Sequence, residues 1–524
     1  MVADIAEKGF VSRWRKVIIL FLSGAMLVSF GVVLKVIVNK IFKSELNSQL
    51  VISPDNSSLR YREWKFPTVP IHIEFYLFDI INELEVRQGE LPSVKQRGPY
   101  SYREFLDKKN ITFDRERTKV SYNEEKTYVF DKELSCPSCD PFKDNITTIN
   151  IPYVILSVVA QGYPAIAKFA INLLLETMNE DLIMRRSVQQ VIWGYNDTIF
   201  MEFAELKKKF KISFIPDVSP LMNLQPNKSY DGEVTVNTGK DNLKLVATWE
   251  RWKNKADVGL WKTKYANMFN GSDGTQFNPG ITKSDLLYFF SSNLCRSIYL
   301  NYDLQHSIEG IDVYRFTTPP SLFENETYIP DNKAFCLHRC YPNGILAGNR
   351  DCKPSSIESP IVISTPHFLL GDPYLRQQVQ GLSPNKDKHG LYLSIEPMTG
   401  IPLQALIRLQ INLHIQQVDY IAGTKNIRES YVPVMYFSNN ATVDHSTAKM
   451  LLDDLIIPLR VCFYVEIGLF CLGSLLILIG CVLLIKGIRR SKNANCIQIN
   501  GATQNDVHNR NGCNSESDPL IPKS

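Results

Sequence analysis

Two continuous apolar segments lie near the two ends of the chain. Residues 17–38 read VIILFLSGAMLVSFGVVLKVIV and are interrupted only by Lys35, and residues 461–485 read VCFYVEIGLFCLGSLLILIGCVLLI and are interrupted only by Glu466. Each is long enough to cross about 30 Å of hydrocarbon as a helix. The first exceeds the apolar core of a signal peptide, and no small-residue cleavage pattern follows it, which favours a retained membrane anchor over a cleaved signal.

The pattern between these segments is mainly that of β-strands. From Leu403 to Ile415 every odd position is apolar, and Leu406 is the only apolar residue between them. This alternation predicts a strand with one buried face. Shorter alternating stretches occupy 71–77, 311–316 and 390–397. We therefore expect an α+β fold in which antiparallel strands dominate.

One long helical region is predicted at 153–211, where no proline follows Pro164 until Pro216. Its apolar stripe at helical spacing consists of Ile166, Phe169, Ala170, Leu173 and Leu174. Core packing is the default interpretation of such a stripe. The alternative is a surface that faces a lipid or a protein partner.

Basic residues lie outside both apolar segments. They are Lys8, Arg13, Arg15 and Lys16 before the first segment and Lys486, Arg489, Arg490 and Lys492 after the second. Because positive charge favours the cytoplasmic side, both termini are predicted to be cytoplasmic. The expected organisation is an N-terminal tail (1–16), a first span (17–38), a lumenal or extracellular ectodomain (39–460), a second span (461–485) and a C-terminal tail (486–524).

Charge refines this organisation in two ways. Lys35 and Glu466 lie near the non-cytoplasmic ends of their spans, so we interpret them as interfacial residues rather than as part of an ion pathway. The formal charge of +4 comes from the tails. The ectodomain is nearly neutral, and it therefore has no electrostatic signature of a nucleic-acid-binding protein.

Two chemical markers are typical of a secreted compartment. The glycosylation sequons begin at Asn56, Asn110, Asn145, Asn196, Asn227, Asn270, Asn325 and Asn440, all within 39–460. The ectodomain cysteines are Cys136, Cys139, Cys295, Cys336, Cys340 and Cys352. Glycans mark exposed sites, and an even number of cysteines in an oxidising compartment suggests disulfides. These residues alone do not fix the pairing.

The sequence CPSC at 136–139 leaves several interpretations open. A local structural disulfide is favoured, while pairing of either cysteine elsewhere and redox or metal chemistry are alternatives. The chain contains no second Cys-x-x-Cys motif that would complete a zinc site. We expect no metal and no cofactor.

Eight stretches of the ectodomain resemble the class B scavenger receptor family, with the lysosomal integral membrane protein branch as the nearest match. They are RGPYSYRE (97–104), WGYND (193–197), LCRSIY (294–299), GIDVYRF (310–316), STPHF (364–368), GLSPN (381–385), IEPMTG (395–400) and RLQIN (408–412). The resemblance extends from the first span through the second. It implies an antiparallel β-barrel-like core with an internal lipid tunnel, and a distal helical bundle.

The resemblance also implies particular residue roles. Cys295 pairs with Cys352 and Cys336 pairs with Cys340, whereas Cys136 and Cys139 have no recognised counterpart. Ligands dock at the apical helical region of the family, which corresponds to 153–211 here. Candidate contacts in that region are Phe169, Leu173, Lys207 and Lys208. The chain has no histidine between His72 and His306, so a histidine pH switch cannot operate there.

These observations predict a receptor and lipid-transfer protein of the lysosomal or late endosomal membrane. The expected ligands are cholesterol, fatty acids or phospholipids in the tunnel and a lysosomal hydrolase at the apical helices. A cell-surface scavenger receptor for lipoproteins and anionic lipids is the alternative. Gly-x-Ser-x-Gly, His-Glu-x-x-His and P-loop motifs are absent from the sequence, and we do not expect an enzyme.

The end of the C-terminal tail, SESDPLIPKS, carries a candidate sorting signal. Glu516 precedes the apolar pair Leu520 and Ile521 by four residues, which resembles the acidic dileucine signal bound by clathrin adaptor complexes. Pro519 and Pro522 disfavour a helix and so favour an extended peptide. We therefore expect this segment to direct the protein to lysosomes.

Overall fold

The computed structural model describes residues 2–55, 59–210, 221–222, 228–349, 352–355 and 358–502. The chain divides into two compact units. One contains Met1–Glu45 and Asp453–Ser524, and the other contains Leu46–Leu452.

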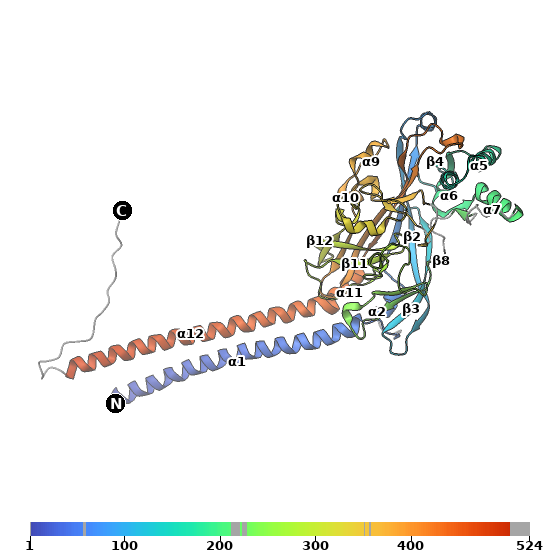
Figure 1. Cartoon of the computed structure of the whole chain (residues 1–524). Helices are drawn as coiled ribbons and strands as arrows, with labels where there is room; N and C mark the ends of the chain where they lie inside the picture. The colour runs from blue at the N-terminus through green and yellow to red at the C-terminus, as the bar shows by residue number, and fades with distance from the viewer. Residues whose placement is uncertain are drawn as a thin grey trace, which may run out of the picture. The chain divides into compact units, whose positions relative to one another are not determined.

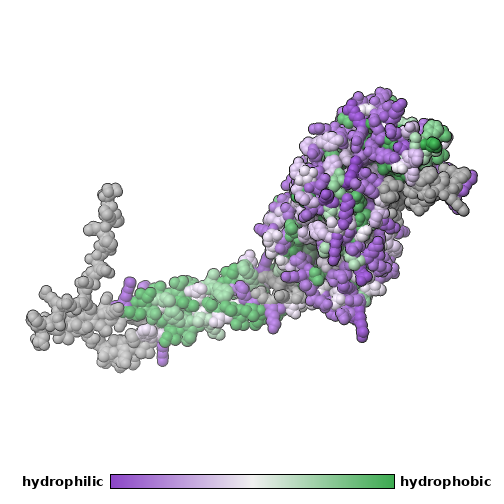
Figure 2. Space-filling model, viewed as in Figure 1, coloured by the Kyte–Doolittle hydropathy of each residue, from purple (hydrophilic) through white to green (hydrophobic). Residues whose placement is uncertain are grey.

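The first unit is built from two long helices, α1 (Val2–Leu50) and α12 (Ile457–Ala502). Within them, Trp14–Val38 and Arg460–Arg490 are apolar and long enough to cross a membrane. Figure 2 shows hydrophobic side chains along both helices. The predicted spans, 17–38 and 461–485, lie inside these two segments.

The two helices of this unit contact each other through glycine. A Cβ atom at Gly24 would lie 2.7 Å from Ile477 Cγ1, and one at Gly473 would lie 2.9 Å from the Gly24 carbonyl oxygen. Small residues allow such a close approach of two apolar helices. Lys35 and Glu466, which we interpreted as separate interfacial residues, form an ion pair with 2.8 Å between Nζ and Oε1.

The second unit is dominated by one antiparallel sheet of fourteen strands (Figure 1). Its main path runs β10-β9-β3-β2-β1-β18-β17-β16-β13-β12-β11, with β8, β14 and β15 attached beside it. The strands of the main path are β1 (Ile71–Ile80), β2 (Val94–Phe113), β3 (Lys119–Asp131), β9 (Val234–Asn237), β10 (Trp249–Trp252), β11 (Leu287–Ser291), β12 (Arg296–Ile308), β13 (Ile311–Thr317), β16 (Tyr392–Glu396), β17 (Ile401–Ile415) and β18 (Ser430–Thr442). The attached strands are β8 (Ser229–Tyr230), β14 (Leu346–Ala347) and β15 (Ile361–Ser364). The chain is thus α+β with antiparallel pairing, as predicted.

Two short ladders and several helices accompany this sheet. The ladders pair β4 (Asn145–Ile149) with β5 (Ile183–Ser187), and β6 (Tyr195–Asn196) with β7 (Leu221–Met222). The helices are α2 (Leu59–Lys65), α3 (Glu83–Arg87), α4 (Ile151–Gln161), α5 (Ala165–Thr177), α6 (Val188–Trp193), α7 (Thr198–Phe210), α8 (Lys264–Asn267), α9 (Pro373–Gln377), α10 (Lys386–His389) and α11 (His445–Leu451).

The predicted helical region at 153–211 is not continuous. It contains α4 to α7, but β5 and β6 interrupt it. The α5 helix ends just before Asn179, which has a φ of +54°, a backbone conformation that asparagine tolerates after a helix. The α6 helix begins with a capping box formed by Ser187 and Gln190. Local capping therefore divides a region whose composition suggests one long helical segment.

The strand predicted at 403–415 is present as β17, but its polar face is buried as well. Gln410 and Asn412 are fully buried where β15 pairs with β17 in the same sheet. The Gln410 side chain donates to the Oδ1 atom of Asn412 at 2.7 Å, and Asn412 donates to the Ser364 hydroxyl at 3.0 Å. Alternation could not predict the burial of these polar residues, because their side chains hydrogen-bond to one another instead of to water.

A stacked histidine pair lies in the layer that covers β17 and β18. The rings of His367 and His389 are 4.3 Å apart, and both side chains are buried. Backbone N–H groups donate to Nδ1 of each ring, from Ser383 and Asn385. The pKa of each histidine is lowered to about 4. Burial is the main cause for both, with a smaller contribution from His389 for His367 and from Arg408 and Lys388 for His389.

These histidines should make stability depend on pH. Their folded pKa of about 4 lies below the ordinary value of 6.5, so their contribution is complete above pH 6.5 and is lost as pH falls towards 4. We expect His389→Asn to reduce the difference in thermal midpoint between pH 7.5 and pH 4.5. An unchanged difference in the variant would contradict this assignment.

Candidate functional site

The two ends of the main sheet meet and make the second unit nearly barrel-shaped. Ser272 forms isolated bridges with Thr248, next to β10, and with Phe289 of β11. The Trp249 N–H donates to the Gly271 carbonyl at 3.1 Å, and the Ser272 N–H donates to the Tyr288 carbonyl at 3.0 Å. This closure, here called the seam, encloses one face of the sheet.

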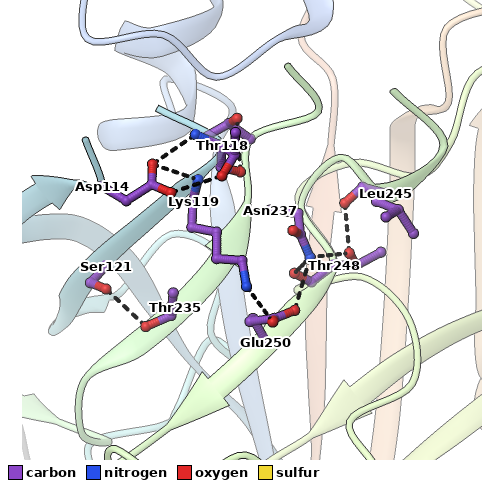
Figure 3. Close-up of polar contacts among 10 residues, drawn as sticks. Asp114, Thr118, Lys119, Ser121, Thr235, Asn237, Leu245, Thr248 and Glu250 are labelled. Carbon is purple, nitrogen blue, oxygen red and sulfur yellow. Dashed lines mark hydrogen bonds and ion pairs between the residues drawn. The ribbon is translucent and has the colours of Figure 1, made fainter. Parts of the chain in front are cut away.

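Polar contacts on the outer face hold β10 in place beside the seam (Figure 3). Lys119 of β3 forms an ion pair with Glu250 of β10 across the intervening strand β9. Asn237 donates from its side chain to the Thr248 hydroxyl at 3.1 Å. A cavity of about 400 Å³ lies at the seam, and its lining includes Thr248, Gly271 and Ser272.

The enclosed face has an aromatic end. The Trp193 ring of α6 lies 5.0 Å from Tyr102, 4.8 Å from Tyr128 and 5.8 Å from Phe75, between ring centroids. These residues come from β2, β3 and β1, so one tryptophan contacts three neighbouring strands. The predicted motif at 193–197 thus places its tryptophan against the inner wall of the barrel.

A second tryptophan contacts the same wall farther along β2. Trp64 of α2 is fully buried, and Lys108 Nζ lies 5.4 Å from the centre of its indole ring. Because Tyr102 and Lys108 are six residues apart on β2, the two contacts are separated by about 20 Å along the strand. The stretch of inner wall between them is the candidate site.

Ionisable side chains occupy this stretch. Directly paired residues on β2 and β3 share a face, and the pairs are Glu104 with Tyr128, Leu106 with Lys126, and Lys108 with Glu124. The Lys108 ammonium donates to Glu124 Oε1 at 2.8 Å, and the Tyr128 hydroxyl donates to Glu104 Oε1 at 3.0 Å. We call Glu104, Lys108, Glu124 and Lys126 the inner polar band.

Burial and charge set the titration of this band. Burial raises the pKa of Glu104, and Lys126 opposes that rise only in part. Burial also disfavours the charge on Glu124, but Lys108 and Lys126 outweigh it and lower the pKa of that carboxylate. For Lys126, burial is outweighed by Glu104 and Glu124, which raise its pKa. The band therefore keeps Lys126 positively charged inside the protein.

Some inward-facing side chains around the band are only partly covered by the protein. Lys108 is fully buried, yet 26% of the side chain of its partner Glu124 is accessible, although protein surrounds this carboxylate. On β17, three strands from β2 along the sheet, Ala405 and Ile407 project inwards and are only half-buried. An inner face that carries both polar and aliphatic groups can contact an amphipathic molecule.

The apical helices expose the apolar stripe that we expected to be in the core. Ile166, Phe169 and Leu173 of α5 are 85%, 60% and 50% exposed, whereas Ile171 and Leu175 are buried. Figure 2 shows this patch as a hydrophobic surface over α5. The core interpretation was wrong for Ile166, Phe169 and Leu173, because α5 packs through a face that contains Ile171 and Leu175. Lys208 of α7 is exposed too, while the Lys207 side chain lies outside the described residues.

The structure contains three disulfides. They join Cys136 with Cys139, Cys295 with Cys352, and Cys336 with Cys340, at Cα separations of 5.2, 5.4 and 4.7 Å. The Trp261 indole N–H donates to the Cys295 carbonyl, which places the second bridge in a buried aromatic cluster. The pairing that sequence left open at 136–139 is local in this structure.

The sequons differ in exposure. Asn110, Asn145 and Asn196 are exposed, and Asn270, Asn325 and Asn440 are half-buried. Asn56, Asn227 and the sorting residues Glu516, Leu520 and Ile521 lie outside the described residues.

Sequence reasoning missed the inner polar band. Charged residues are adjacent on both strands, as in Lys108-Lys109 and Glu124-Glu125-Lys126. The sequences of these two strands therefore show no alternation of polar and apolar residues. A segment with charged residues on both faces is typical of solvent-exposed chain.

Comparison with known proteins places these features in a family. The model of the CD36 family matches residues 19–484. The chain is 32% identical to Scavenger receptor class B member 1 of Mus musculus over 461 residues, which cover 87% of each chain. It is 34% identical to Lysosome membrane protein 2 of Mus musculus and 33% identical to that of Homo sapiens, in each case over 400 residues covering 76% of this chain and 80% of the relative. None of these names describes an enzyme.

The ion pair of the inner polar band can be tested for its contribution to folding. We expect Glu124→Gln to leave the buried Lys108 without a counter-charge and to destabilise the protein by about 3 kcal/mol. The outward-facing pair Lys109–Glu125 lies beside it, with 2.6 Å between Nζ and Oε1. As a matched control, Glu125→Gln should destabilise the protein far less, because solvent can replace this exposed pair. Denaturant unfolding of the purified chain measures both values, and similar losses would contradict an inward position of Glu124.

Proposed function

Because the chain belongs to the CD36 family, we propose that it is a two-span membrane receptor that carries lipid through its ectodomain in lysosomal or endosomal membranes. The lipid that we propose it carries is cholesterol, a fatty acid or a phospholipid. Relatives named as a scavenger receptor and as a lysosome membrane protein cover most of the chain and support this combination.

The observation that carries the lipid proposal is the incompletely filled interior of the barrel. Glu124 is partly accessible within the fold, and Ala405 and Ile407 of β17 leave aliphatic surface uncovered on the inner face of the same sheet. Apolar surface without a protein partner costs about 25 cal/mol per Å² when it meets water. A lipid chain would cover that surface, and a tunnel would give the lipid a route to the membrane.

The membrane topology is part of the same proposal. In this topology both termini are cytoplasmic and residues 39–460 are lumenal. The basic residues outside the two spans and the sequons between the spans support it. In this arrangement the three disulfides lie on the oxidising side of the membrane. The C-terminal tail can then reach clathrin adaptor complexes.

The exposed apolar face of α5 favours a second candidate, in which the chain binds a particle or protein at the apical helices. Ile166, Phe169 and Leu173 form this face. A lipoprotein at the cell surface or a lysosomal hydrolase would bury it. Exposed apolar patches commonly mark interaction sites. The lipoprotein and the hydrolase would bind the same surface of the protein but in different cellular compartments.

The lipid proposal predicts that a bulky side chain in the interior of the barrel reduces the amount of bound lipid. Ala405→Trp places a large ring on the inner wall, and we expect it to reduce co-purified lipid at least several-fold. Native mass spectrometry of the detergent-solubilised full chain identifies and counts that lipid. Val129→Trp is the control, because Val129 is 53% exposed on the outer face of β3. Wild-type protein that carries no lipid would overturn the proposal.

The sorting proposal predicts a change of location without unfolding. We expect Leu520→Ala combined with Ile521→Ala to move the steady-state pool from lysosomes to the plasma membrane, and Glu516→Ala to produce a weaker shift, because an address signal does not stabilise the ectodomain. Surface biotinylation and lysosomal co-sedimentation measure the two pools. A double variant with wild-type distribution would exclude this signal, and a wild-type protein found mainly at the surface would favour the scavenger-receptor candidate.

A further inference from the structure

One glycosylation sequon lies on the wall of the cavity at the seam. Asn270, which begins the sequon at 270–272, lines this cavity of about 400 Å³ together with residues from both sides of the closure. Thr248 precedes β10, and Tyr288 belongs to β11. A molecule in the cavity would therefore contact both edges of the sheet where they meet.

The walls of the cavity combine exposed apolar groups with an unused amide. Tyr265 of α8 is 58% exposed and Leu286, just before β11, is 48% exposed, and both line the cavity. Asn278 lines it as well, and its side chain forms no hydrogen bond with the described residues. Apolar walls with a few polar groups, in a volume of roughly 300–1,000 Å³, are typical of sites for small molecules.

The side chain of Asn270 is in position to carry a sugar. Its backbone N–H donates to the Ser297 hydroxyl at 2.8 Å, which fixes the residue beside β12. Its side-chain amide is half-buried at the cavity wall and forms no hydrogen bond within the described part of the chain. A glycan attached to Asn270 Nδ2 therefore begins at the cavity.

We propose that the first N-acetylglucosamine of an N-linked glycan on Asn270 occupies the seam cavity and stabilises the closure of the barrel. In the transfer from a lipid-linked oligosaccharide pyrophosphate, Asn270 Nδ2 forms the bond to C1 of the sugar and loses one proton, and the lipid pyrophosphate leaves. The apolar face of the sugar ring then covers Tyr265 and Leu286, and its polar groups meet the Asn278 amide. The covalent bond holds the sugar at the cavity, which favours it over any free ligand.

The hydroxyl residue of the sequon sets the order of events. Ser272 is 2% exposed, its hydroxyl donates to the Gln276 carbonyl, and the same oxygen accepts the Gly274 N–H at 2.9 Å. The transferase has to bind this hydroxyl, so the sugar is added before the seam closes. The sheet then closes with the sugar already in place.

The experiment uses the full glycosylated chain in detergent and a glycoamidase, which cleaves the bond between asparagine and the first sugar. We expect the Asn270 glycan to resist the amidase in the folded protein and to be released after denaturation, because the cavity covers that bond. Asn196 is the matched control, since it is exposed on β6 and its glycan should be released from the folded protein. Mass spectrometry of the two peptides measures release at each site.

Variants of the wall and of the sequon test the contact itself. Tyr265→Ala and Leu286→Ala remove exposed side chains, and each should speed the release at Asn270 several-fold without changing the release at Asn196. With all glycans trimmed by an endoglycosidase to one N-acetylglucosamine, Asn270→Gln should lower the thermal midpoint by about 2 °C, as for a small loss of stability. Asn196→Gln should leave the midpoint unchanged.

This inference rests on the lumenal topology in the proposed function, and the outcomes separate the two. A chain that carries no glycan at any sequon contradicts the topology. A chain with a glycan on Asn196 contradicts only the cavity proposal if Asn270 is unoccupied, if both sites are released equally fast from the folded protein, or if Asn270→Gln has the wild-type midpoint.

Discussion

Closure of the main sheet at residues 271–272 is the constraint on which the rest of the ectodomain depends. Without it, β10 and β11 would be edge strands with unpaired backbone groups. The closing segment must approach β11 very closely, since a Cβ atom at Gly271 would lie 2.0 Å from the Tyr288 carbonyl oxygen. Gly271 also has a φ of +95°, which only glycine adopts readily. One glycine thus allows a long sheet to enclose an interior.

Enclosure changes the energetics of the charged residues on β2 and β3. On the outer face, Lys109 and Glu125 form a pair that solvent can replace. On the inner face, Lys108 and Glu124 form a similar pair in the same pair of strands, but Lys108 has no access to water. Its ammonium also lies 5.1 Å from the centre of the Tyr122 ring. A lysine–glutamate pair on the outer face of the sheet is therefore dispensable for folding, whereas a pair of the same residue types on the inner face is required for it.

The sequence predicted the elements that carry a regular pattern. Leu403 to Ile415 alternates, and β17 forms there; the two long apolar segments are helices. The seam could not be predicted, because two residues that bridge two strands produce no periodicity. Nor could the burial of Gln410, since its hydrogen bonds come from the separate segment containing Ser364 and His367. The division of the helical region depended on capping at Asn179 and Ser187, which is a local signal weaker than the apolar composition around it.

The two candidate binding surfaces share a physical property: each presents apolar area that the fold does not use for its own stability. The α5 helix is held by Ile171, Leu175 and Asn172, whose Oδ1 accepts the Ala422 N–H at 2.7 Å. These contacts fix the helix without covering Phe169. The barrel is likewise held by its hydrogen-bonded strands, and Ala405 and Ile407 stay partly uncovered within it. Because backbone pairing and a few buried contacts carry the fold, both apolar surfaces remain available to bind ligands without unfolding the protein.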